Sequence, residues 1–162
     1  MTEARDTAGV IAPPPLIALA AVLLGLALDW LMPAYVLTVL LTLWARIAIA
    51  VVLFAAGAGL AIPALRGFRS AGTHAEPWKP SLALVTGGIF GRLRNPMYVA
   101  LTLILVGLAI VLASDWMLVM TIIFVAVIHF GVVKREERYL EAKFGDAYRQ
   151  YKARVPRYGL PF

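Results

Sequence analysis

The sequence predicts an all-α, multi-pass membrane protein with about four transmembrane helices. Hydrophobic residues make up 62% of the 162 residues and charged residues only 15%, whereas soluble domains average about 45–50% apolar and about 25% charged residues. The apolar residues form long runs, and most cationic residues flank those runs. The chain has no cysteine, which excludes disulfides, thiolate metal sites and cysteine nucleophiles.

Two apolar runs in the first half predict two helices of a single domain over 1–162. The first helix is expected at about 14–31, and this segment lacks the basic start and the cleavage site of a secretory signal. The second is expected at about 42–64 and should end at Pro63, because proline interrupts the hydrogen bonding of a helix. A short luminal or interfacial piece is expected at 34–41.

Two further apolar runs predict a helical hairpin. They cover about 97–113 and 117–133, and the polar turn Ser114-Asp115-Trp116 separates them. The two helices are therefore expected to be antiparallel neighbours.

The loop 66–95 and the tail 134–162 carry most of the positive charge. The loop is rich in glycine and proline, which disfavours a regular helix, and the tail is expected to contain a helix at about 134–152. Thirteen of the 15 Lys and Arg lie in these segments: Arg66, Arg69, Lys79, Arg92, Arg94, Lys134, Arg135, Arg138, Lys143, Arg149, Lys152, Arg154 and Arg157. The positive-inside rule then predicts a cytoplasmic loop and tail. Four spans place the N-terminus in the cytoplasm too, and we expect the inner membrane of a bacterium or archaeon.

The first candidate motif is Arg94-Asn95-Pro96-Met97-Tyr98, where the third helix begins. Pro96 suits the first turn of a helix, and Asn95 is expected to be its N-cap. A helix N-terminus that also offers an arginine and a tyrosine hydroxyl can hold a carboxylate. The alternative is an ordinary cap with interfacial side chains, and the residues alone do not decide between these interpretations.

The second candidate motif is Glu136-Glu137, where the fourth helix leaves the membrane. Adjacent residues on a helix point about 100° apart, so one carboxylate can face a pocket while the other faces solvent. Such a pair can accept ribose hydroxyls or a cationic amine, or can simply be a solvated face paired with Lys134 and Arg138. His129 lies seven residues before Glu136 and is expected on roughly the same helical face.

Other chemistries lack a signal in the sequence. Neither a phosphate-binding glycine loop nor a dinucleotide-binding fingerprint is present, and no cluster has metal-ligand spacing, so no metal is expected. A net charge of +6 would suit nucleic-acid binding, but no nucleic-acid motif supports that function and no nucleic-acid partner is expected.

Taken together, the motifs resemble the isoprenylcysteine carboxyl methyltransferase family. This family and the phospholipid N-methyltransferases form one group of integral membrane methyltransferases. The resemblance covers about 66–158 and rests on Gly72-Thr73, Pro77, Pro80, Leu84-Val85-Thr86-Gly87-Gly88, Arg94-Asn95-Pro96-Met97-Tyr98, Glu136-Glu137, Leu140, Phe144-Gly145, Tyr148, Tyr151 and Val155-Pro156-Arg157.

The resemblance implies a non-Rossmann pocket for S-adenosylmethionine on the cytoplasmic side. The implied cofactor-binding residues are Leu82, Ala83, Leu84, Val85, Phe90, Asn95, Pro96, Met97, Tyr98 and Glu136. Arg94, Glu137, His129 and Arg135 are the further candidates for roles in catalysis or acceptor binding. The expected acceptor is a lipophilic molecule that enters from the bilayer.

Two positions depart from the eukaryotic prenylcysteine enzymes. Asn95 stands where those enzymes have histidine, and Val132 stands where they have an arginine that holds the substrate carboxylate. Arg135 is the cation expected nearest to that face of the helix. The sequence therefore leaves three functions: methyl transfer to a lipidic or isoprenoid acceptor, phospholipid N-methylation, or a non-catalytic membrane binding or scaffold protein.

Overall fold

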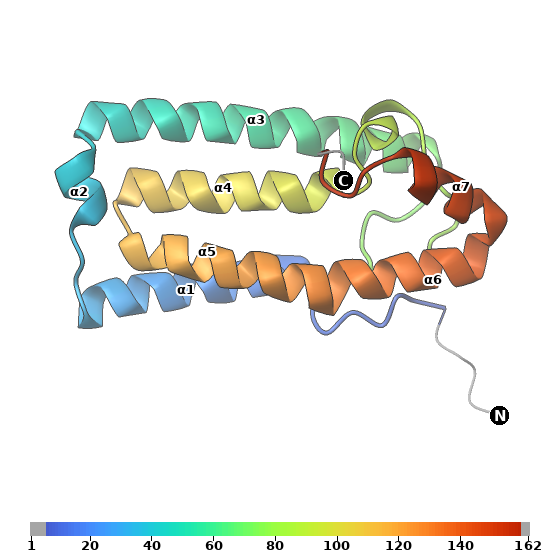
Figure 1. Ribbon diagram of the computed structural model, residues 1–162, viewed down its shortest axis with the longest axis horizontal. Coiled ribbons are helices and arrows are strands. Elements are labelled where there is room, and N and C mark those ends of the chain that lie inside the picture. The colour runs from blue at the N-terminus through green and yellow to red at the C-terminus, as the bar shows by residue number, and fades with distance from the viewer. Residues whose placement is uncertain (1–5, 160–162) are drawn as a thin grey trace.

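The structure, a computed structural model, describes residues 6–159. Within these residues it is entirely helical, and its long helices lie side by side with alternating direction (Figure 1). The elements in chain order are α1 (Pro14–Leu31), α2 (Val36–Leu40), α3 (Leu43–Ser70), the 3₁₀-helix η1 (Gly88–Gly91), α4 (Pro96–Leu112), α5 (Asp115–Ile128), the π-helical segment η2 (His129–Val133), α6 (Lys134–Phe144) and α7 (Asp146–Arg154).

Three helices are long and apolar enough to cross a membrane, namely α1, α3 and the continuous helix Asp115–Phe144. The fourth apolar helix, α4, has 17 residues, which corresponds to about 25 Å. The all-α, multi-pass membrane fold predicted from the sequence is thereby confirmed. The apolar part of the continuous helix ends at Val133, and the charged α6 extends beyond it.

Small residues allow the helices to approach closely. A Cβ atom placed on Gly25 of α1 would lie 2.7 Å from the Cα of Met117 on α5. A Cβ atom on Gly57 of α3 would lie 3.2 Å from the carbonyl oxygen of Ala100 on α4. Close backbone approach through glycine is typical of helix packing in membranes, so these glycines fix how α1 meets α5 and how α3 meets α4.

The end opposite the loop 66–95 is held together by acidic residues. The two carboxylate oxygens of Asp115 accept from the backbone N–H groups of Val36 and Leu37, at 2.9 and 3.0 Å, and so cap α2. Ser114 caps α5 and also hydrogen-bonds to Asp29. The predicted helical hairpin is present, but its turn lies at Ala113 and Ser114 rather than at 114–116, because α5 already begins at Asp115. The expected interfacial piece at 34–41 contains the short helix α2.

Two predicted helices differ from the structure. Helix α3 continues past Pro63 to Ser70, because the loss of one hydrogen bond at a proline does not stop a long apolar helix of this kind. The helix expected at 134–152 breaks at Gly145, whose positive φ of 56° separates α6 from α7. Because of this break, α7 turns back towards the start of α4 (Figure 1).

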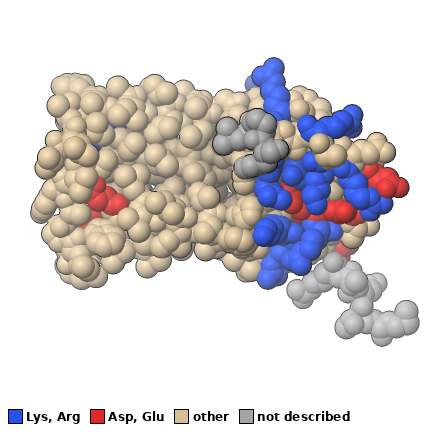
Figure 2. Space-filling view, in the orientation of Figure 1, with Lys and Arg blue, Asp and Glu red and all other residues tan. Residues whose placement is uncertain are grey.

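Charge is distributed unevenly along the bundle. Lys and Arg gather at one end, and the visible face of the other end shows a small acidic patch (Figure 2). Residues at both ends of the described chain also lie at the basic end, since Asp6 pairs with Lys143 at 2.6 Å and Pro156 accepts from the backbone of Arg94. The loop, the tail and the segment before α1 therefore meet at one end of the helices.

Candidate active site

Two adjoining cavities lie at the basic end of the bundle. The larger has a volume of about 530 Å³ and lies between α3, α4, the start of α1 and the loop 73–78. The smaller has a volume of about 60 Å³ and lies between the loop 81–85, α6 and α7. Several residues line both cavities, namely Phe68, Thr73, His74, Ala75, Glu76, Pro77, Phe90, Arg94, Asn95 and Glu136. The two cavities therefore form one candidate site with two lobes.

The predicted motif at the start of α4 lines the larger lobe with all five of its residues. Pro96 is the first residue of α4, as expected. Asn95 occupies the N-cap position, but the expectation that its side chain caps the helix is wrong. Its Nδ2 atom instead donates to the carbonyl oxygen of Arg157 at 3.2 Å. The side chain therefore ties the tail to the start of α4.

The two glutamates of the second motif have different surroundings. Glu136 lines both lobes, and its Oε2 atom accepts from the hydroxyl of Tyr98 at 2.8 Å. No Lys or Arg within residues 6–159 forms an ion pair with Glu136. As expected, one carboxylate of the pair faces a pocket.

Glu137 does not face solvent, so this part of the expectation is wrong. The residue is 7% exposed, and its partners are Arg94 and Arg157 rather than Lys134 and Arg138. Arg94 Nη1 donates to Oε1 at 2.8 Å, and Arg157 Nη2 donates to Oε2 at 2.7 Å. Two cations on one carboxylate leave this buried cluster with a net charge of +1.

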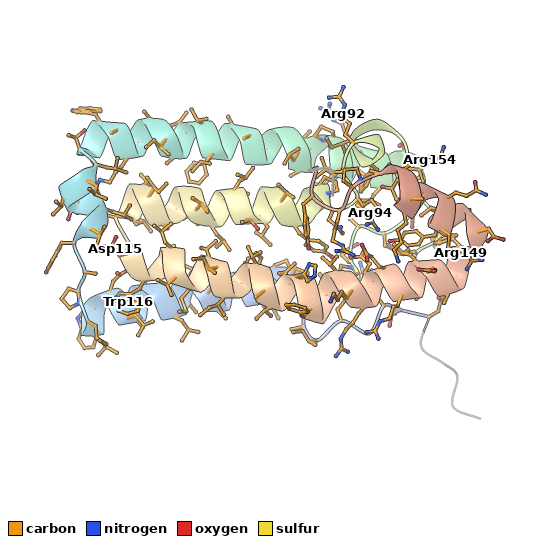
Figure 3. The ribbon with its side chains drawn as sticks, in the orientation of Figure 1. Arg92, Arg94, Asp115, Trp116, Arg149 and Arg154 are labelled. Carbon is orange, nitrogen blue, oxygen red and sulfur yellow. The ribbon has the colours of Figure 1, made fainter. Side chains whose placement is uncertain are left out.

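Arg94 lies inside the basic end, whereas Arg149 and Arg154 lie on its outside (Figure 3). Its Nε atom is buried and has no hydrogen-bond partner among the described residues. A buried donor without a partner costs about 1–3 kcal/mol, so Arg94 has a donor left for a hydrogen-bond acceptor. Nearby, burial and then the charge of Glu137 raise the pKa of Tyr148 to about 12, above that of an ordinary tyrosine. The Tyr148 hydroxyl is therefore a neutral group beside Arg94.

The loop residues predicted to bind the cofactor lie mostly at the smaller lobe. Ala83, Leu84 and Val85 line it, and Phe90 lies between the two lobes. The hydroxyl of Tyr151 donates to the carbonyl of Phe90 at 2.7 Å and fixes that segment. Leu82 is 62% exposed and lines neither lobe.

His129 and Arg135 are not at the cavities. The Nδ1 atom of His129 lies 2.8 Å from the hydroxyl of Tyr158, and Arg135 donates to the carbonyl of Gly9 at 2.9 Å. The expected alignment of His129 with Glu136 fails because residues 129–133 are π-helical, which adds a residue to the turn and shifts the register of the helix. Val132 is fully buried in the helix core rather than in a cavity.

Sequence reasoning missed three groups of residues around the site. Arg157 holds Glu137, although no pattern in the sequence predicts that contact. The loop 73–78 forms a wall of both lobes, and its only signal was the glycine and proline pattern of the resemblance. The apolar wall of the larger lobe comes from Pro14, Pro15, Ala61, Leu65, Leu101 and Ile104.

These residues fit S-adenosylmethionine. Its amino-acid part carries a carboxylate, which suits the free Nε donor of Arg94, and an ammonium group, which suits a carboxylate without a cation such as Glu136. Its adenosine part is flat and partly apolar, which suits the lobe lined by Leu84, Val85 and Phe90. The combined lobes also leave apolar wall for a second molecule.

Comparison with known proteins gives an independent result. The model of the family described as phospholipid methyltransferase matches residues 45–147. An uncharacterized protein of Haemophilus influenzae is 45% identical over 62 residues, which is 38% of this chain and 98% of that protein. No solved structure matches. The matched region contains the start of α4 and both glutamates, and the chain therefore belongs to the phospholipid methyltransferase family of integral membrane methyltransferases, as the resemblance implied.

Proposed function

We propose that this protein transfers a methyl group from S-adenosylmethionine to a lipid acceptor in the larger lobe. The observation that carries the proposal is the composition of one continuous site. Its lining combines polar groups that suit the cofactor, namely Arg94, Tyr98 and Glu136. It also includes apolar residues of α3, a helix apolar and long enough to cross a membrane, and of the shorter apolar helix α4.

The cofactor supplies a methyl group on a positively charged sulfur, which is already activated for displacement. In this proposal Arg94 binds the cofactor carboxylate, while Glu136, oriented by the Tyr98 hydroxyl, binds its ammonium or ribose. Phe90, Leu84 and Val85 contact the adenine. The remaining task of the protein is to align the acceptor and to exclude water, and the loop 73–78, which lines both lobes, is placed to contribute to both.

The acceptor reaches the larger lobe from the bilayer. Ala61 and Leu65 of α3 face the lobe together with Leu101 and Ile104 of α4. An acyl or isoprenoid chain fits such a wall because it passes from lipid to an apolar surface without exposing its own apolar surface to water. The cofactor, which is charged, enters instead from the side of the basic loop and tail, which we place in the cytoplasm by the positive-inside rule.

An amine-bearing lipid is the acceptor that we favour over a prenylcysteine carboxylate. Val132, where the eukaryotic enzymes have a carboxylate-binding arginine, is buried in the core. Glu136 offers a carboxylate that no cation neutralises. An amine lipid has no carboxylate to bind at its reacting group, so it does not need the arginine that Val132 replaces.

The proposal is tested with purified protein in lipid bilayers and S-adenosylmethionine labelled in its methyl group. Parallel reactions contain phosphatidylethanolamine, a prenylcysteine analogue or a total lipid extract, and mass spectrometry identifies the product. We expect label in a lipid, with the amine lipid ahead of the prenylcysteine analogue. Lack of transfer to every acceptor, by protein that retains its fold, would exclude methyltransferase activity and favour a non-catalytic binding protein.

A further inference from the structure

The segment 155–159 returns to the start of α4 and contacts the site through Arg157. The backbone N–H of Arg94 donates to the carbonyl of Pro156 at 3.0 Å, and that of Asn95 donates to the carbonyl of Arg157 at 3.2 Å. Backbone hydrogen bonds thus hold this segment in place without the Arg157 side chain. A substitution at Arg157 can therefore change the charge at the site and leave the path of the chain intact.

The side chain of Arg157 occupies both oxygens of Glu137. Its Nε donates to Oε1 at 2.8 Å and its Nη2 to Oε2 at 2.7 Å. This is the two-pronged arrangement that arginine and carboxylate prefer. Arg94 makes only one hydrogen bond to the same carboxylate, from Nη1 to Oε1. Arg157 therefore has the stronger contact, and Arg94 the weaker.

We infer that Arg157 is a positioning residue that keeps Arg94 available for the cofactor. If Arg157 were absent, the buried carboxylate of Glu137 would have one cation instead of two. The Glu137 carboxylate would then accept two hydrogen bonds from Arg94. The second would come from the Nε atom, which now has no partner. Arg157 competes for the carboxylate and prevents this, so Arg94 retains a donor for an anionic group in the site. This inference rests on the proposed function, because the anionic group is the cofactor carboxylate.

Three variants test the inference. Arg157→Ala removes the competing contact. Arg157→Lys keeps the charge but has a single donor centre, and Arg154→Ala is the matched control. Arg154 lies in the same part of the chain on the outside of α7 (Figure 3), and its Nε donates only to the carbonyl of Gln150.

We expect the KM for S-adenosylmethionine to rise about tenfold in Arg157→Ala, because one charge-assisted hydrogen bond to the cofactor is lost. The kcat should stay unchanged, since Arg157 contacts no reacting atom. Arg157→Lys should restore part of the affinity, and Arg154→Ala should match the wild type. In a Glu137→Gln background, Arg157→Ala should change KM by less than about twofold, because no charged carboxylate remains to capture Arg94.

Direct titration of the cofactor into each variant distinguishes a failure of the proposed function from a failure of the inference about Arg157. A wild-type protein that binds no S-adenosylmethionine would overturn the proposed function and this inference with it. A wild type that binds, with an Arg157→Ala variant of equal affinity, would overturn the inference alone. If Arg157→Ala does not extract as a folded protein, Arg157→Gln replaces it. An equal loss of cofactor affinity with Glu137 present and in the Glu137→Gln background would show that Arg157 acts independently of Glu137, which would overturn the inference.

Discussion

Glu137 should contribute more to stability than any other single carboxylate in the described chain, because it neutralises two arginines at a buried position. We take Glu137→Gln as the perturbation, since glutamine keeps the volume of the side chain and creates no cavity. The substitution leaves Arg94, 9% exposed, and Arg157, 25% exposed, without an anionic partner. Breaking a buried ion pair costs about 3 kcal/mol. For a chain of this size that corresponds to a fall in Tm of about 6–12 °C.

Glu141→Gln is the matched control for this substitution, because Glu141 lies one turn further along α6. Its ion pair with Lys152 spans 3.1 Å, and the side chains are 34% and 40% exposed, so its loss should cost less than about 1 kcal/mol. Both variants are heated in the same detergent at the same scan rate, and helix content is followed by circular dichroism. Equal and small shifts in Tm for the two variants would refute the assignment of Glu137 as a buried double ion pair.

Three further predictions concern the bundle and its orientation. Gly25→Ala places a Cβ atom against the backbone of Met117 and should destabilise the protein by about 1–3 kcal/mol. Gly59→Ala is the control, because its Cβ atom meets nothing within 4 Å, and it should be neutral or stabilising. Equal Tm values for the two variants would contradict the close contact of α1 with α5. Asp115→Ala removes the acceptor for the backbone N–H groups of Val36 and Leu37. Hydrogen exchange of these two amides should become faster, while the affinity for the cofactor stays the same. An unchanged exchange rate would show that the cap is not formed. In intact cells an impermeant thiol reagent should label Val39→Cys in α2 but not Ala147→Cys in α7; the reverse pattern would invert the membrane orientation.

The apolar runs predicted the number and order of the long helices because burial in lipid requires long unbroken helices, whose length and composition are local properties. The turn at Ser114 was predictable for the same reason, since it is the polar interruption between two apolar runs. The start of α4 at Pro96 was also predictable, because proline fits a first helical turn. These features depend on neighbours in the sequence and not on the rest of the fold.

The contacts that complete the site depend on the fold and were not predictable. The π-helical segment 129–133 shifts the face of the continuous helix, so the regular spacing that placed His129 beside Glu136 does not apply. Gly145 turns α7 back and brings Arg157 to Glu137, a pairing across 20 residues that no periodicity encodes. Asn95 does not cap α4 through its side chain, because that side chain is turned to the returning tail, where its amide donates to the carbonyl of Arg157.

The central claim, that the cavity at the start of α4 binds S-adenosylmethionine, is tested most directly by calorimetric titration of the cofactor into four proteins. These are the wild type, Tyr98→Phe, Glu136→Ala and the control Glu141→Gln. Tyr98→Phe removes the hydroxyl that orients Glu136 at 2.8 Å, and Glu136→Ala removes the carboxylate itself, so both should bind the cofactor more weakly. Glu141 lines neither lobe, so its variant should bind like the wild type. Wild-type affinity in both Tyr98→Phe and Glu136→Ala would contradict the assignment of this cavity as the cofactor site.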